Sequence, residues 1–480
     1  MDKIALIPMF LAFGLLLYKE PRELFIYYFI PILTVFPIYY ETDLAPGLPE
    51  FSFWSSALLP ILIVWVINKR MKGYQVSWLD LIIVVHLLVI FYGQWMNSTY
   101  KEAQKILFND VMSRLVPYIL AKSYFTEGVS KIQMLKVLVI VGAIVGLFSL
   151  YESRMWVNVF DSYIRDIWPH HVPWDIPMKR GGFKRASGAF GHPICAGYFF
   201  AIIVPMALWI WREKLFNKKF LGFAIMLLCI AGVLASISRA PIIGMFVSFV
   251  IIWFGWSQRK IVVLGIVSVA LLISLIFLLP QFISYVSVDR SSARTEDQEN
   301  AAYRKELLDN YMEVLAEKPL IGWGRFTVPV VKGQKSIDNE YLFLALVSGK
   351  ISLYMYILII VWILARLLRL SIKSETSDPQ TRLAWCLFAG LVASIFTQAT
   401  VYAGTQTVQF FYILIGMSEA LVISPRKIKD SITETINTLS NIKNRYRFTR
   451  TIPGMAQRFK FEEKIDKLDL TNEYNFSRTL

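Results

Sequence analysis

Long apolar runs separated by short polar connections make up almost the whole chain. A helix needs about twenty apolar residues to cross a membrane, and the sequence offers roughly thirteen runs near that length. They cover approximately residues 4–18, 23–40, 52–68, 79–97, 104–122, 134–151, 192–211, 220–237, 240–256, 261–279, 339–368, 383–403 and 406–423. The pattern predicts an all-α, polytopic integral membrane protein with about 12–13 transmembrane helices.

Two long polar segments interrupt these runs and define the predicted organisation. The larger one lies between the tenth and eleventh spans and contains an amphipathic helix. The predicted parts are N-terminal transmembrane helices (1–151), an external loop rich in Trp and Arg (152–191), transmembrane helices (192–279), a large external loop (280–338), C-terminal transmembrane helices (339–423) and a cytoplasmic tail (424–480).

The short connections predict the orientation, because cytoplasmic loops carry an excess of Lys and Arg. The connection from Glu41 to Phe51 is acidic and has neither residue, so it is expected outside. The same parity puts both long loops outside, the N-terminus outside and the C-terminus inside. The connections that we assign to the cytoplasm are Lys69 to Lys72, Arg212 to Lys219, Arg259-Lys260 and Arg366 to Arg382.

The composition agrees with a membrane protein and excludes several other classes. The 480 residues are 56% hydrophobic and only 18% charged, which is too apolar for a soluble protein. A net charge of +15 would suggest nucleic acid in a soluble chain. Here the positive-inside bias and the anionic lipid headgroups explain the charge, so we expect membrane lipids and no nucleic acid as partners.

Neither a metal site nor a nucleotide site is predicted. The four histidines, His86, His170, His171 and His192, are too few and too unsuitably spaced for zinc, and a site at His170, His171 and Asp175 is disfavoured. All three cysteines fall within apolar runs and imply no disulfide framework. Glycine-rich phosphate loops and nucleotide-binding fingerprints are absent from the sequence, so no soluble nucleotide-sugar transferase domain is expected.

The larger external loop carries an arginine in line with an apolar stripe. A helix is predicted from Asn300 to Lys318, and at helical spacing Arg304, Tyr311 and Leu315 share a face with Leu308. A guanidinium at this place lies at the lipid–water boundary. It either snorkels from an interfacial helix or meets an anion.

The smaller external loop ends in four cations interleaved with glycines, from Lys179 to Gly191. Glycines let a backbone approach a ligand closely, and the guanidinium groups of Arg180 and Arg185 suit phosphate oxygens. A flexible, solvated loop end is the alternative. The aromatic-rich segment from Trp156 to Asp175 could stack on sugar rings or anchor the chain at the interface.

A third cation, Arg239, lies in the tight turn between the eighth and ninth spans. An arginine between two apolar helices must either snorkel to the interface or meet an anion. The cations around Arg185, Arg239 and Arg304 therefore lie on one predicted membrane face, in three separate segments. Their simplest shared ligand is a lipid-linked diphosphate at the outer leaflet.

These segments resemble a known family. The stretch from Phe183 to Pro193 looks like an "R-x-S-G-x-F-x-x-P" entry to a span, and Ser236 to Ala240 looks like an "x-x-S-R-x" turn. Arg304 followed by Lys318 to Gly324 looks like an "R…P-L-x-G-x-G" loop. Their order and spacing resemble the O-antigen ligase and O-antigen polymerase superfamily of bacterial envelope glycan enzymes, over roughly residues 130 to 420.

The resemblance implies a metal-independent glycosyltransferase without a cofactor, in the bacterial inner membrane. Its donor would be an undecaprenyl-diphosphate-linked glycan, used at the periplasmic face, and a chain-length regulator is a further possible partner. The loop 280–338 would then be the periplasmic catalytic loop, with Arg304 nearest the leaving group. The residues expected to bind substrate are Arg180, Arg185, His192, Arg239 and Glu340.

The residues at the start of the eleventh span help to distinguish a ligase from a polymerase. Ligase members have a histidine before the asparagine here, whereas this chain has Asp338 before Asn339. A carboxylate can still act as the general base toward a sugar hydroxyl, with Asn339 and Glu340 as orienting neighbours. The alternative is that Asp338 caps the helix. We therefore favour a polymerase of a surface polysaccharide, either O-antigen or exopolysaccharide. A ligase, a lipid-linked-glycan transporter and a non-catalytic scaffold are the alternatives.

Overall fold

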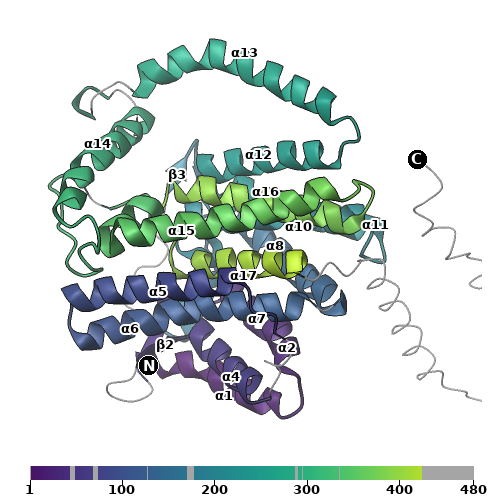
Figure 1. Cartoon of the computed structure of the whole chain (residues 1–480), viewed down its shortest axis with the longest axis vertical. Helices are drawn as coiled ribbons and strands as arrows, with labels where there is room; N and C mark the ends of the chain where they lie inside the picture. Colours follow the sequence, from purple (N-terminus) through teal and green to yellow (C-terminus); the bar gives the residue numbers. More distant parts are fainter. Residues whose placement is uncertain are drawn as a thin grey trace, which may run out of the picture. The chain divides into compact units, whose positions relative to one another are not determined.

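The structure is a computed structural model that describes residues 2–43, 49–68, 74–126, 128–169, 178–286, 290–293, 296–334 and 336–423 (Figure 1). Every structural statement below refers to these residues. His170, His171, Asp175 and the predicted tail 424–480 lie outside them.

Helices form nearly all of the described chain, which confirms the all-α prediction. The first group is α1 (Ile7–Leu16), α2 (Pro21–Leu24), α3 (Ile30–Val35), α4 (Phe53–Ile67), α5 (Trp78–Asn97), α6 (Tyr100–Asp110), α7 (Val116–Phe125), α8 (Gly128–Met155) and α9 (Val159–Ile167). The second group is α10 (Pro193–Arg212), α11 (Lys219–Ala235), α12 (Arg239–Trp256), α13 (Lys260–Val286), α14 (Glu296–Glu317), α15 (Glu340–Lys373), α16 (Pro379–Gln398) and α17 (Thr405–Ile423).

The remaining elements are short. Two antiparallel strand pairs occur, β1 (Glu41–Asp43) with β2 (Glu50–Ser52) and β3 (Lys179–Arg180) with β4 (Phe183–Lys184). Two π-helical turns and three 3-10 turns complete the described elements. These are η1 (Asp2–Leu6), η2 (Phe25–Phe29), η4 (Val111–Leu115), η5 (Gly188–Phe190) and η6 (Arg290–Ser292).

Within the described residues, seven helices are long and apolar enough to cross a membrane: α5, α8, α10, α12, α15, α16 and α17. Four shorter apolar helices accompany them, over Lys3–Leu16, Phe53–Ile67, Lys219–Ala235 and Lys260–Ile273. The structure therefore supports an integral membrane protein. The predicted number of about 12–13 spans remains a prediction, since several runs fold as shorter or interrupted helices.

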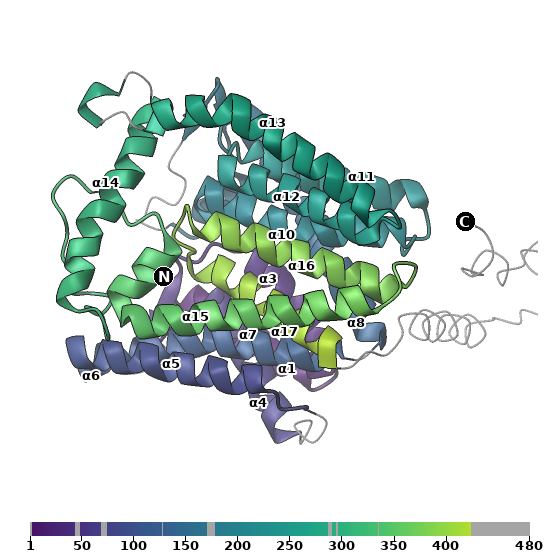
Figure 2. The same cartoon turned by 45° about the horizontal axis from the view of Figure 1, so that its top comes forward.

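The centre of the bundle is built from α10, α16 and α17. Helix α10 packs against α8, α11, α12 and α16, and α17 packs against α7 and α16 (Figure 2). Because apolar burial does not draw helices together in lipid, close approach depends on small residues. A Cβ on Gly416 of α17 would lie 2.4 Å from the Tyr118 carbonyl oxygen of α7. Gly244 of α12 faces Ala393 of α16 in the same way.

The run predicted at 104–122 folds as one interrupted helix. Helices α6 and α7 continue into each other through the π turn η4, which contains Arg114. The guanidinium Nε of Arg114 lies 3.0 Å from Asp110 Oδ1 and stands over the Tyr412 ring of α17. Asp110 and Arg114 therefore pair with each other, and Arg114 faces α17 in the bundle.

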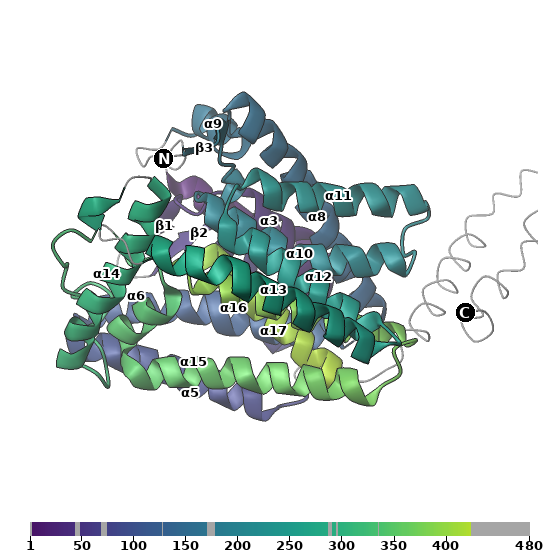
Figure 3. The same cartoon turned by 90° about the horizontal axis from the view of Figure 1, so that it is seen from above.

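Helix α14 packs on the beginning of α15. Its buried stripe is Leu307, Tyr311 and Leu315, which form a hydrophobic cluster with Leu342 and Leu346 of α15. Figure 3 shows α14 beside the beginning of α15. The predicted stripe had Leu308 in place of Leu307, but Leu308 is 43% exposed. Both Leu307 and Leu308 fit the helical spacing, and the packing against α15 selects Leu307.

Arg304 lies one turn before Leu307, at the exposed edge of the buried stripe. This position leaves its guanidinium outside the apolar contact between α14 and α15. The packing of α14 on α15 therefore determines the position of Arg304.

Candidate functional site

Arg304 reaches a neighbouring loop and is surrounded by charged residues. Its guanidinium donates a hydrogen bond to the Thr400 carbonyl oxygen, in the connection between α16 and α17 (3.4 Å). Desolvation lowers the pKa of Arg304, Asp338 opposes this effect, and Arg180 and Arg239 add to it. Asp338, Arg180 and Arg239, which come from three other segments of the chain, are therefore near enough to affect the charge of Arg304.

Arg185 and Arg180 lie on the turn that joins α11 to α12. The Arg185 guanidinium donates to the Ser238 hydroxyl at 3.0 Å and to the Ser236 carbonyl at 3.5 Å. The Arg180 guanidinium donates to the Ile237 carbonyl at 3.2 Å. Ile237 has a φ of 44°, a left-handed conformation that is rare for a β-branched residue. The two arginines therefore bind to and stabilise a strained turn, and they approach Arg239 from this side.

Arg239 is the first residue of α12, and its side chain is exposed. The first-turn N–H groups of a helix have no intrahelical partner and favour anions. Ser238, in the cap position, makes no side-chain cap here, because its hydroxyl donates to Ser236 O and accepts from Arg185. Cationic side chains and a helix N-terminus thus lie together beside the turn.

His192 caps α10 and is held in its neutral form. Its Nδ1 accepts a hydrogen bond from the Ile194 N–H (3.2 Å), so the ring proton belongs to Nε2. Burial lowers the pKa of His192 to about 4, Arg185 adds to this effect, and Asp338 opposes it. At neutral pH the ring is therefore a hydrogen-bond donor through Nε2 and carries no charge.

The three residues before and at the start of α15 differ in their surroundings. Asp338 is half-buried and accepts a hydrogen bond from the Ser336 hydroxyl (2.7 Å). Asn339 is the N-cap, since its Oδ1 accepts from the N–H groups of Tyr341 and Leu342 at 3.0 and 3.1 Å. The expectation that Asp338 caps this helix is therefore wrong.

Glu340 is only 2% exposed, and its Oε2 accepts from the Ala403 N–H at 2.9 Å. This contact holds the loop between α16 and α17 next to the start of α15. Glu340 is therefore buried and makes a structural contact between two segments of the chain.

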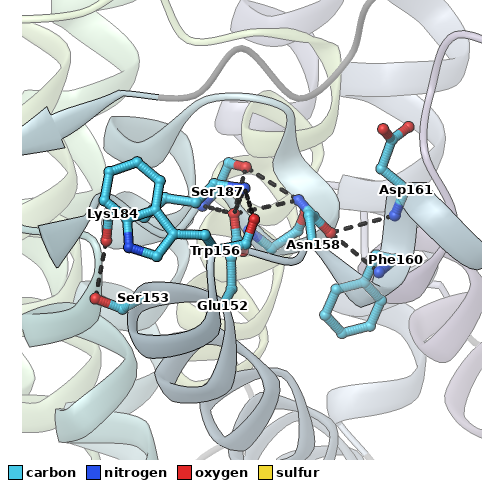
Figure 4. A network of polar contacts seen from close by, with 9 residues as sticks. Glu152, Ser153, Trp156, Asn158, Phe160, Asp161, Lys184 and Ser187 are labelled. Atoms are coloured by element: carbon cyan, nitrogen blue, oxygen red, sulfur yellow. Dashed lines mark hydrogen bonds and ion pairs between the residues drawn. The ribbon is translucent and has the colours of Figure 1, made fainter.

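A buried polar network anchors the basic loop (Figure 4). The Glu152 carboxylate of α8 pairs with Lys184 Nζ at 3.3 Å, and both side chains are 1% exposed. The same carboxylate accepts from the N–H groups of Ser187 (3.1 Å) and Gly188 (2.8 Å). Asn158 joins the network by donating to the Gly188 carbonyl (2.8 Å). The alternative of a wholly solvated loop end does not hold, because the segment after β3 is fixed to α8.

Several residues of this region had not been singled out from the sequence. They belong to the connection between α16 and α17 and to the loop after α14. Thr400 and Ala403 make the contacts described above, and Arg325 donates to the Tyr402 hydroxyl at 3.0 Å. This short connection lies between two apolar runs and has no motif. The one available signal was its run of polar and small residues.

Among the described residues, no group of three or more His, Cys, Asp or Glu side chains is arranged to hold a metal ion. The predicted sugar-contacting aromatic residues are partly described. Trp156 is 45% exposed, and Trp174 lies outside the described residues.

A known protein family matches part of the chain. Residues 224–356 match the O-antigen ligase family. This match, over about a quarter of the chain, supports a relation to the O-antigen ligase and polymerase superfamily. The expected resemblance is thereby confirmed. The match supports an activity of the O-antigen ligase or polymerase type and a partner that is a lipid-linked glycan. No curated protein sequence matches the chain.

The matched residues begin within α11 and end within α15. They include Arg239, Arg304 and Asp338. Arg180, Arg185 and His192 come from the preceding part of the chain and join the same cluster. The matched region and the basic loop before it are therefore treated together as one candidate site.

Proposed function

We propose that this protein polymerises undecaprenyl-diphosphate-linked oligosaccharide repeats into a surface polysaccharide, without a metal ion, at the periplasmic face of the bacterial inner membrane. The observation that carries the proposal is the set of hydrogen bonds by which Arg180 and Arg185 reach the turn before Arg239, together with the electrostatic effect of Arg180, Arg239 and Asp338 on Arg304. Guanidinium groups gathered from separate segments suit a diphosphate, because each can donate two parallel hydrogen bonds to phosphate oxygens.

The reaction is displacement at the anomeric carbon of the donor. A hydroxyl oxygen of the acceptor sugar forms the new bond to this carbon, while the bond from the carbon to the diphosphate oxygen breaks. The polyprenyl diphosphate leaves with the bonding electrons, and the arginines stabilise the charge that develops on it. The hydroxyl proton passes to the Asp338 carboxylate.

Arg304 is assigned the place nearest the leaving group. Asp338 raises the pKa of Arg304, and the Arg304 side chain is exposed. Arg185 and Arg180 support the turn before Arg239 and supply further positive charge. His192 contributes a neutral Nε2–H donor beside Asp338.

Polymerisation and ligation use the same kind of donor and differ in the acceptor. Asp338 stands where ligase members are expected to have a histidine, which favours the polymerase. Transfer of the glycan to a lipid A core is the second candidate, and the description of the matching family as O-antigen ligase favours it.

Deletion of the gene in its native host tests this assignment. A polymerase defect leaves single repeats, or none, on the cell surface. Full-length polymer that accumulates on the lipid carrier would instead show that the protein is a ligase. Single repeats retained on the cytoplasmic leaflet would show a translocation defect.

A further inference from the structure

Helix α15 is broken one third of the way along its length. Gly349 has φ 78° and ψ 170°, a region that essentially only glycine occupies. The segment from Glu340 to Ser348 is therefore a separate helical piece that starts beside Asp338. The remaining part, from Lys350 to Lys373, carries the lipid-length apolar run.

The loop after α14 replaces the hydrogen bonds that the break removes. In a continuous helix, the Lys350 N–H would donate to the Leu346 carbonyl. Here the Lys350 N–H donates to the Pro319 carbonyl (2.8 Å), and the Leu346 carbonyl accepts from the Trp323 N–H (2.8 Å). The Val347 carbonyl likewise accepts from the Gly324 N–H (2.9 Å). Backbone groups that the break would otherwise leave unsatisfied are thus paired by the loop.

Glycines allow the loop to enter this space. A Cβ on Gly349 would lie 1.9 Å from the Leu320 carbonyl oxygen. A Cβ on Gly322 would lie 2.6 Å from the Gly349 nitrogen, and one on Gly93 of α5 would lie 2.7 Å from the Ile321 carbonyl oxygen. Three elements therefore meet backbone to backbone at one point.

Side chains at the end of α5 bind the same loop. Asn97 donates from Nδ2 to the Gly322 carbonyl (3.2 Å) and accepts at Oδ1 from Lys318 Nζ (2.7 Å). The buried Gln94 accepts at Oε1 from the Arg325 N–H (2.8 Å). The Trp323 indole N–H donates to the Val314 carbonyl of α14 (3.0 Å) and so attaches α14 as well.

We propose that the loop from Lys318 to Arg325, inserted into the break of α15, sets the distance between Arg304 and Asp338, and that Asn97 and Gln94 are positioning residues for the reaction. The assignment rests on the proposed function. Arg304 is carried by α14, and Asp338 immediately precedes the first piece of α15. The loop, the apolar stripe of α14 and this piece form one packed unit, and α5 fixes it to the bundle.

Asn97→Ala is the main test, because it removes two contacts to the loop without adding atoms. Misplacement of a catalytic group by about 1 Å can cost about 100-fold in rate. We therefore expect kcat for chain growth to fall by about 10- to 100-fold, while binding of polyprenyl diphosphate changes by less than about threefold. Gln94→Ala should act in the same direction. Asn217→Ala, at an exposed asparagine away from the loop, is the matched control and should retain the wild-type kcat.

Glycine variants test the backbone contact. Gly349→Ala and Gly322→Ala should lower kcat more than Asn97→Ala does, because both introduce strain as well as contact with backbone atoms. Gly265→Ala of α13 is the control, since nothing lies within 4 Å of its added Cβ. Because the glycine variants can also fail to fold, the conclusion depends on Asn97→Ala and Gln94→Ala.

A distance measurement separates this proposal from the proposed function. Spin labels on Leu308→Cys of α14 and Tyr92→Cys of α5, both at exposed positions, report the placement of α14 whether or not the protein elongates glycans. The distance distribution should broaden or shift when Asn97→Ala is added. An unchanged distribution, or an unchanged kcat in folded Asn97→Ala and Gln94→Ala, would overturn the positioning role. If the wild type shows no activity but Asn97→Ala still changes the distance distribution, the proposed function is refuted. The structural role of the loop in placing α14 then still holds.

Discussion

The buried pair of Glu152 and Lys184 offers a quantitative test of how the basic loop is held. Both side chains are 1% exposed, and the carboxylate also accepts hydrogen bonds from the backbone N–H groups of Ser187 and Gly188. Glu152→Gln keeps the shape of the side chain and removes its charge. It leaves the Lys184 ammonium buried without its carboxylate.

Breaking a buried ion pair by removing one partner typically costs about 3–5 kcal/mol. The amide also turns an NH₂ donor toward backbone N–H donors, and the loss of one hydrogen bond to a charged group costs about 1.5–3 kcal/mol when it is considered alone. These two effects overlap, so we expect a total of about 3–5 kcal/mol for Glu152→Gln. Lys184→Met combined with Glu152→Gln should cost less than the sum of the two single changes, because no unpaired charge remains.

The assay is the unfolding transition of the purified protein in detergent, followed by donor binding on the folded fraction. Glu23→Gln is the matched control, because the pair of Lys19 and Glu23 is exposed and joins α2 to the bend before it. Such an exposed pair contributes about 0.2–1 kcal/mol. Equal, small effects of Glu152→Gln and Glu23→Gln would refute the anchoring role of the buried network.

Three further predictions concern the chemistry of the cluster. Asp338→Asn should abolish proton acceptance and lower kcat while the fold is kept, because Asn339 and not residue 338 caps α15; normal turnover in this variant would remove the general-base role. In the folded protein the pKa of His192 is about 4, below the ordinary value of 6.5. As the pH falls, the unfolded state therefore takes up a proton before the folded state does. The wild type should lose stability relative to His192→Asn between pH 6.5 and pH 4. Unfolding measured across that pH range checks this, and parallel curves for the two proteins would contradict it. Chelators should leave the activity of the purified protein unchanged, and activity that disappears with a chelator and returns with magnesium would disprove metal independence.

Much of the architecture could be predicted from the apolar runs. Lipid leaves backbone groups no partner but the chain itself, so long apolar runs fold as helices. The runs did not reveal interruptions within a helix. Arg114 lies in a π turn, and Gly349 breaks α15 inside a run that read as one span of 339–368. The only sequence signal for this break was a glycine followed by a lysine within an apolar run.

Candidate site residues could be predicted where a motif or the topology placed a cation on one predicted face of the membrane. This reasoning selected Arg180, Arg185, Arg239 and Arg304, and the structure brings these residues together. It could not select Thr400 or Ala403, since their contribution is a backbone group that depends on tertiary packing. The choice of Leu308 over Leu307 failed because both residues fit a helical stripe, and only the position of α15 decides between them.

Chain growth in a reconstituted system is the most direct test of whether this protein polymerises lipid-linked repeats. Purified protein in vesicles would be supplied only with undecaprenyl-diphosphate-linked repeats, with no lipid A core present. The account predicts a ladder of glycans longer than one repeat and one released undecaprenyl diphosphate for each new linkage. Arg304→Ala should slow this growth by about 100- to 1,000-fold. Donor that stays as single repeats until a lipid A core is added, or an Arg304→Ala variant that elongates like the wild type, would contradict it.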